Sequence, residues 1–128
     1  MNTLSRKHRS SGFSLIELLV AMGILTIISA IAVPMYTDYI ESSQRGVLLN
    51  SMATMEVFQE DFRLRNGAYA VDLANIAAIT AAIGWEPNDD NGTTYVVADG
   101  DGSTYQLTAT NAEGISMCRV YPARDACP

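Results

Sequence analysis

Few side chains of this protein could carry out chemistry, and the acid Glu17 is the most unusual of them. It lies near the start of an apolar run, from Phe13 to Tyr36, that contains no other charged residue. A carboxylate at the centre of a bilayer costs about 2.5–3.5 kcal/mol, and less near the interface. An ionisable residue in such a segment therefore predicts a function and a partner that satisfies its charge.

The residue types that are missing exclude most enzyme chemistry. Beyond residue 12 the chain has no His and no Lys. It therefore cannot form a Ser-His-Asp or Cys-His nucleophile, a His-ligated metal site, a Schiff base or a phosphate-loop lysine. We predict that the protein is not an enzyme and has no cofactor and no metal.

The charge balance also limits the partners. Without Arg6, Lys7 and Arg9 the chain has five arginines against fourteen acids, a formal charge of −9. Affinity for phosphates depends on clustered Lys and Arg, so this balance argues against a broad nucleic-acid surface but leaves room for a local basic spot.

One acidic segment resembles the start of a calcium-binding loop. It is DGDGS, from Asp99 to Ser103, but its twelfth position is Thr110 where such a loop needs an acid. We interpret the segment as a hairpin turn and leave calcium at Asp99 and Asp101 open.

A partner for Glu17 arises if the chain is cut between Gly12 and Phe13. Hydrolysis would convert a neutral amide into a positive amine on Phe13. Glu17 follows four residues along the same helix, so it can neutralise that amine or the amine of a neighbouring subunit. Two other interpretations stay open: a plain membrane anchor, and a signal peptide cleaved after Ala32, where the residues fit the small-x-small pattern.

The apolar run is long enough to cross a membrane. Its 24 residues would form a helix of roughly 36 Å, against a hydrocarbon core of about 30 Å. The basic residues Arg6, Lys7 and Arg9 precede the run. The positive-inside rule therefore predicts a cytoplasmic N-terminus and export of the residues after about position 36.

The two cysteines, Cys118 and Cys127, both lie in the part predicted to be exported. An even pair in an oxidising compartment predicts a disulfide, which would close a short C-terminal loop. Two free thiols are the alternative.

The N-terminal block RSSGFSLIELLVAMGILTIISAIAVPMYTDYIESSQR resembles the N-terminus of type IV pilins and of their pseudopilin relatives. The matching features are a short basic leader that ends at Gly12, then Phe13, Glu17 as fifth residue of the cut chain, and Pro34. The resemblance implies a prepilin with a class III leader. It further implies cleavage after Gly12 and N-methylation of Phe13 by a prepilin peptidase, and assembly into a helical filament by inner-membrane pilus machinery.

The same resemblance bears on the helix and the disulfide. It implies that the region near Pro34, residues 23–34, is not helical in the filament, and Gly23 and Pro34 are the expected bends. It also implies that Cys118 and Cys127 bound a surface loop, although this loop is unusually short.

Residues 38–66 are predicted to continue the helix. An apolar stripe at helical spacing should pack on a sheet, and Asn66-Gly67 should end the helix. The predicted stripe is Leu48, Met55, Phe58 and Phe62, with Met52 beside them, while Gln59 is placed among the polar positions.

The sequence after the long helix predicts a short helix and a small sheet. A short helix over residues 73–83, capped by Asp72 and stopped by Gly84, should precede three strands at 93–98, 103–110 and 114–120. Hairpin turns would join these strands into an antiparallel sheet of three or four strands, in which Tyr105, Leu107 and Ala109 share one face.

The predicted fold class is α+β, a pilin fold with a long N-terminal helix packed against an antiparallel sheet head. Its expected parts are a leader (1–12), a transmembrane and filament-core helix (13–36) and an exported head (37–128). The predicted function is a structural subunit of a type IV pilus, an inner-membrane precursor that becomes part of a surface filament. A type II secretion pseudopilin and a secreted soluble binding domain are the alternatives. The sequence leaves open whether the subunit is major or minor, and what the head binds.

Overall fold

The structure, a computed structural model, describes residues 12–88, 91–98 and 100–128. The chain divides into two compact units, residues 1–38 and 39–128, which are described separately. Asp99 and most of the predicted leader lie outside the described residues.

One helix, α1, runs from Leu15 to Asn66. Pro34 lies inside it, and residues 15–66 are helical throughout. The expected loss of helix near Pro34 concerns the assembled filament and stays a prediction. The helix ends where the sequence predicts, because Gly67 adopts a φ of 83° and its N–H donates to the Arg63 carbonyl over 2.7 Å.

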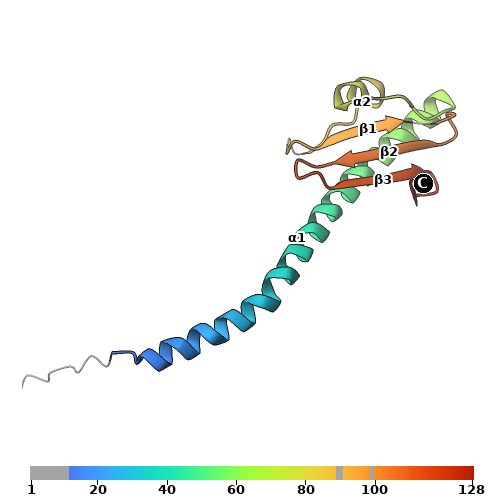
Figure 1. The fold of residues 1–128 in the computed structure, drawn as a ribbon. Helices are drawn as coiled ribbons and strands as arrows, with labels where there is room; N and C mark the ends of the chain where they lie inside the picture. The colour runs from blue at the N-terminus through green and yellow to red at the C-terminus, as the bar shows by residue number, and fades with distance from the viewer. Residues whose placement is uncertain (1–11, 89–90, 99) are drawn as a thin grey trace, which may run out of the picture. The chain divides into compact units, whose positions relative to one another are not determined.

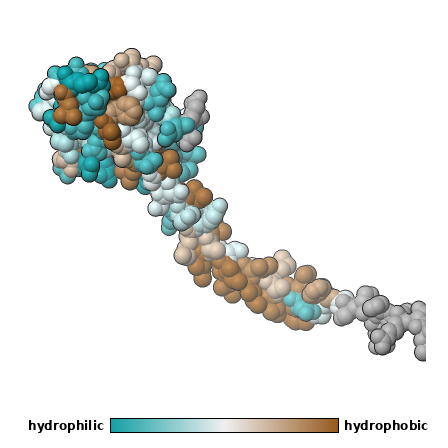
Figure 2. Space-filling view, turned by 180° about the vertical axis from the view of Figure 1, so that it is seen from behind, coloured by the Kyte–Doolittle hydropathy of each residue, from teal (hydrophilic) through white to brown (hydrophobic). Residues whose placement is uncertain are grey.

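The first unit has almost no interior of its own. The most apolar 18-residue stretch of α1 has a mean hydropathy of 2.5, and none of it is buried. In Figure 2 brown, hydrophobic side chains dominate this part of the surface, whereas the head is largely teal. A helix that is apolar all round and unburied needs lipid or other protein around it.

The second unit is built on a four-stranded antiparallel sheet in the order β1-β2-β3-β4 (Figure 1). Its strands are β1 (Thr94–Ala98), β2 (Tyr105–Thr110), β3 (Ser116–Tyr121) and β4 (Asp125–Ala126). The sequence predicted the first three strands, and β4 adds a short edge within the C-terminal loop.

The inner face of the sheet forms the core with the second half of α1. Leu107 of β2 is fully buried, and it pairs with Val97 of β1 on the same face. The predicted alternation of Tyr105, Leu107 and Ala109 is therefore confirmed. The helix contributes three buried aliphatic residues to the same core: Leu48, Met52 and Met55.

The predicted apolar stripe is wrong at one position. Phe58 is 40% exposed, whereas the adjacent Gln59 is fully buried. Gln59 faces the core because its amide meets both backbone groups of Ala70: Nε2 donates to the carbonyl over 2.8 Å, and Oε1 accepts from the N–H at 3.0 Å. A buried polar side chain is tolerated when its hydrogen bonds are satisfied.

The short helix is later than predicted. Helix α2 runs from Ile76 to Ile83, and Asn75 caps it by accepting from the Ala78 N–H. Asp72 lies three residues before this cap and has a left-handed φ of 59°, so it does not cap the helix. The predicted stop at Gly84 is confirmed, since this residue adopts the left-handed conformation and closes the helix.

Three tyrosines pack against one another in the core. The ring of Tyr105 stacks on Tyr121 at 5.0 Å and meets Tyr69 edge-on at 4.9 Å. Burial raises the pKa of all three phenols above the ordinary value of 10.0. The buried hydroxyl of Tyr105 has no hydrogen-bond partner among the described residues.

We expect the head to lose stability in alkali. An acid whose pKa is raised by folding stays neutral in the native state, while the unfolded chain ionises near pH 10. Stability is therefore complete below pH 10 and falls as the pH rises through the native pKa values. The part of the absorbance at 295 nm that these three phenols contribute should lag behind that of free tyrosine and rise together with the loss of near-ultraviolet circular dichroism. Full ionisation with an intact fold would contradict the burial of these phenols.

Candidate functional site

The N-terminal start of α1 is fixed by a capping interaction. Ser14 precedes the helix, and its Oγ accepts from the Glu17 N–H at 3.2 Å, while its carbonyl accepts from the Leu18 N–H. Ser-x-x-Glu is the capping-box pattern, with the acid at the third helical position. Glu17 therefore lies in the first turn of α1, where the positive end of the helix dipole favours a negative charge.

Sequence reasoning missed the role of Ser14, although the Ser-x-x-Glu signal was present before the apolar run. Ser14 caps a helix that begins at Leu15, so Gly12 and Phe13 both lie before the helix. Phe13 is 86% exposed and lies on a short segment before the first turn. The structure thus separates the predicted cleavage point from the helix by two residues.

A further hydroxyl of this segment, that of Thr26, is satisfied locally. Thr26 Oγ1 donates to the Met22 carbonyl over 2.8 Å, which is the common way for a helical Thr to bond its own helix. Among the described residues of the first unit, Glu17 makes no ion pair. Glu17 is the one acidic or basic side chain of residues 13–36, and an ion-pair partner for it has to come from outside the described contacts.

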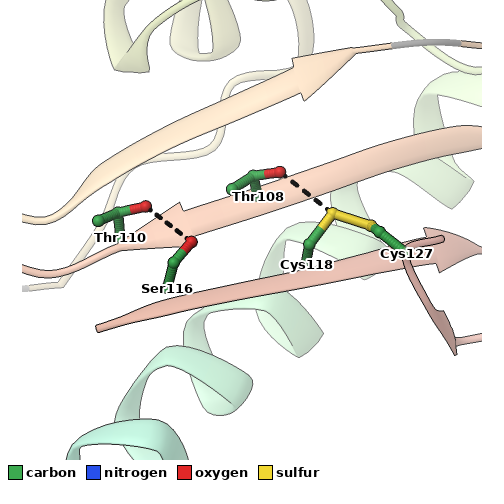
Figure 3. Close-up of a disulfide and its surroundings, with 5 residues drawn as sticks. All are labelled: Thr108, Thr110, Ser116, Cys118 and Cys127. Carbon is green, nitrogen blue, oxygen red and sulfur yellow. Dashed lines mark hydrogen bonds between the residues drawn. A yellow bond between two sulfur atoms is a disulfide. The ribbon is translucent and has the colours of Figure 1, made fainter. Parts of the chain in front are cut away.

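At the other end of the chain, a disulfide joins Cys118 and Cys127, as predicted. Figure 3 shows the bridge between β3 and the C-terminal segment, with Thr108 Oγ1 donating to the Cys118 sulfur over 3.2 Å. The enclosed loop folds back so that β4 pairs with β3, and Arg124 adopts a positive φ of 63°.

Arg124 ties this loop to the helix. Its Nε and Nη2 donate to Glu56 Oε1 over 3.1 and 2.9 Å, in a forked geometry. The Glu56 side chain is only 16% exposed, so the ion pair is partly shielded from water. The Glu56 carboxylate raises the pKa of Arg124, which keeps this guanidinium charged. A contact between residues so far apart in sequence holds the loop on α1.

Removal of the disulfide should destabilise the head by about 2–4 kcal/mol, as expected for a short closed loop. The variant is Cys118→Ser with Cys127→Ser, and the measurement is denaturant unfolding followed by circular dichroism. The matched control is the wild-type protein with a reductant, which should lose a similar amount. An unchanged midpoint in both would mean that Arg124 and β4 pairing hold the loop without the bridge.

A shallow cavity of about 330 Å³ lies beside this ion pair, lined by Arg119, Arg124, Glu56 and Tyr121 among others. Arg119 Nη1 donates to the Arg124 carbonyl over 3.1 Å, and Arg119 makes no ion pair among the described residues. Of the two arginines at this cavity, only Arg119 is without an acid partner among the described residues. The other head arginines are each paired with an acid: Arg45 with Glu41, Arg63 with Glu60 and Arg65 with Asp61.

The calcium hypothesis receives no support from the described residues. Asp101 Oδ1 accepts from the N–H groups of Ser103 and Thr104 and from the Ser103 hydroxyl, as in a turn. These bonds, the Ser103 hydroxyl first, lower the pKa of Asp101 to about 2. Within residues 12–88, 91–98 and 100–128, no group of three or more acids, His or Cys is placed to hold a metal.

Two family models match this chain, one at its N-terminal segment and one over the rest of the helix and the head. Residues 7–33 match the family model "Prokaryotic N-terminal methylation motif", and residues 34–121 match "Type IV minor pilin ComP, DNA uptake sequence receptor". The fold and the N-terminal segment together define a type IV pilin. Because the second model covers more than half of the sequence, the chain belongs to this family of type IV minor pilins.

Curated relatives are fimbrial proteins. "Type IV major fimbrial protein FimA" of Dichelobacter nodosus is 34% identical over 116 residues, 89% of this chain and 66% of its own length. "Fimbrial protein Q" of Moraxella bovis is 36% identical over 82 residues, 64% of this chain and 45% of its own. "Fimbrial protein EcpC" of Eikenella corrodens is 34% identical over 76 residues, 59% of this chain and 48% of its own. The chain thus spans between 45% and 66% of these relatives, and no solved structure matches it.

Proposed function

We propose that the protein is a structural subunit of a type IV pilus. It is made as a precursor held in the inner membrane by residues 13–36, with the N-terminus in the cytoplasm. A prepilin peptidase cleaves it after Gly12 and methylates the new amine of Phe13. Residues 13–36 then leave the lipid and pack against those of other subunits in the filament, while residues 37–128 form the head.

One observation carries this proposal: an unburied apolar helix whose first turn holds a single acid, four residues after Phe13. The helix is compatible with lipid as well as with a bundle of similar helices, but the acid is satisfied only when an amine reaches it. A methylated amine keeps its positive charge, so the pairing survives the modification. The match of residues 7–33 to the methylation motif supports the same processing.

The mass of the protein purified from cells tests the processing. Loss of residues 1–12 with a gain of about 14 Da, one methyl in place of a hydrogen, is the expected result. A chain beginning at Val33 would instead indicate a signal peptide cleaved after Ala32. An uncut chain inside a filament would also contradict the proposal. The match to a type IV minor pilin family favours the pilus over a secretion pseudopilin.

A second candidate function is suggested by the family description, which includes a receptor for DNA uptake sequences. Arg119 and Arg124 line the 330 Å³ cavity; Arg119 has no ion pair among the described residues, whereas Arg124 is paired with Glu56 of the same cavity. The overall balance of this chain opposes such binding, since acids outnumber Lys and Arg by fourteen to eight. DNA affinity depends on clustered cations.

The test is binding of a short duplex to the full chain in detergent across a salt series, with Arg119→Ala as the variant. We expect no measurable binding at physiological salt, that is, a dissociation constant weaker than about 10⁻⁴ M. Sequence-dependent binding that Arg119→Ala abolishes would establish the receptor function. Arg65→Ala is the matched control, because Arg65 is an exposed arginine paired with Asp61 on α1.

A further inference from the structure

The outer face of the sheet, the one turned away from the core, is free of charge. Along β2 the buried residues alternate with Gln106, Thr108 and Thr110, which point to this outer face. The strand register places partners beside them on β1 and β3. The outer face comprises three rows: Thr94, Thr110 and Ser116; Val96, Thr108 and Cys118; and Ala98, Gln106 and Val120.

None of these nine residues is ionisable, apart from the cysteine held in the disulfide, although the chain contains fourteen acids. Arg119 of β3 is paired with the buried Leu107 and so belongs to the other face, whereas Asp125 of β4 pairs with Val120 at the border of the outer face. Two copies of so acidic a chain repel one another over most of their surfaces. The outer face is a part of the head on which they can approach without that repulsion.

The chemistry of the outer face is also self-complementary. A symmetric contact between two copies presents the same patch to itself, so a patch rich in one charge would repel its own copy. Hydroxyl groups both donate and accept hydrogen bonds, whereas a carboxylate only accepts and a guanidinium only donates. Figure 3 shows two such hydroxyls, Thr110 and Ser116, which are hydrogen-bonded to each other within the chain over 3.0 Å.

We propose that the outer face is a homotypic contact surface that binds the outer face of a second copy of this chain. Three strands of this length present a patch of about 300 Å² at the usual strand spacing and rise. A standard interface buries about 800 Å² per partner, so a single pair of heads associates weakly. The contact becomes effective when many heads are displayed together. In this respect it rests on the proposed function, which arrays the heads in a filament.

The experiment displays the full chain on vesicles of zwitterionic phosphatidylcholine and follows vesicle aggregation by turbidity. Thr110→Glu and Thr110→Arg each place a charge in the first row, so that two identical variants bring like charges into the same small contact. Each variant alone should slow aggregation by about tenfold or more, because like charges at a contact cost several kcal/mol. An equal mixture of Glu-bearing and Arg-bearing vesicles should recover the wild-type rate.

The matched control is Ala81→Glu, which adds a charge to an exposed position of α2, outside the outer face. It should aggregate like the wild type, and thermal melts should show that all variants remain folded. If only the Glu variant slowed aggregation, or if the mixture failed to recover, the partner would be a different surface and the homotypic contact would be wrong. Wild-type vesicles that carry the chain and do not aggregate would also overturn it. Failure of the chain to float with the vesicles would contradict membrane insertion, and so the proposed function itself.

Discussion

Cells that carry Glu17→Ala are expected to insert the precursor into the membrane at least as well as wild-type cells and to lose filaments containing this subunit. The alanine removes a carboxylate whose burial in lipid is unfavourable, by about 2.5–3.5 kcal/mol at mid-bilayer and less near the interface, so membrane insertion becomes easier. The same change removes the acid that pairs with the Phe13 amine. The favourable free energy of this ion pair, which drives the helix from lipid into the filament, is then lost. Incorporation of the subunit into filaments should fall by about tenfold or more.

Two measurements check this result. Membrane fractionation reports insertion, and immunolabelling of sheared surface fibres reports incorporation of the subunit. Glu17→Asp keeps the charge on a shorter side chain and should retain part of the incorporation, whereas Glu17→Gln should behave like the alanine variant. The matched control is Glu41→Ala, an exposed acid on the same helix that pairs with Arg45 and lies outside the apolar run.

Normal filaments from Glu17→Ala cells would overturn the charge-pairing account. Loss of filaments together with loss of the precursor from the membrane would point instead to a role in insertion. A Ser14→Ala variant distinguishes loss of the Glu17 charge from loss of the helix cap, because it should weaken only the first turn, by about 1 kcal/mol. It should therefore impair assembly much less than the change at Glu17.

The second large effect is expected at Gln59. Gln59→Leu keeps most of the side-chain volume but removes both hydrogen bonds to Ala70, leaving a buried N–H and a buried carbonyl without partners. Each unsatisfied buried group costs about 1–3 kcal/mol, so we expect a loss of about 2–4 kcal/mol in the free energy of unfolding. This is a substantial part of the stability of a small head.

Urea unfolding of the protein in detergent, followed by circular dichroism, measures this loss. Gln44→Leu is the matched control, since it makes the same change on the same helix at a position that is not fully buried. It should cost less than about 0.5 kcal/mol, as most surface substitutions do. Equal midpoints for the two variants would mean that water replaces the lost bonds at Ala70.

Much of this molecule is determined locally by its sequence. The apolar run and its single acid follow from residue types alone, because a membrane selects composition before any tertiary contact exists. The ends of both helices at Gly67 and Gly84 were predictable, since glycine readily adopts a positive φ. The buried face of β2 was predictable as well, because side chains alternate along a strand.

The tertiary structure decided what depends on distant partners. Phe58 and Gln59 are neighbours on the helix, and hydrophobicity alone assigns the wrong one to the core. Gln59 is buried because the backbone of Ala70, eleven residues later, satisfies its amide. Likewise, no pattern in the sequence pairs Glu56 with Arg124, because the two meet only after the disulfide loop has folded onto α1. Local rules fix which backbone shapes are possible, but polar groups become internal only where the fold supplies their hydrogen-bond partners.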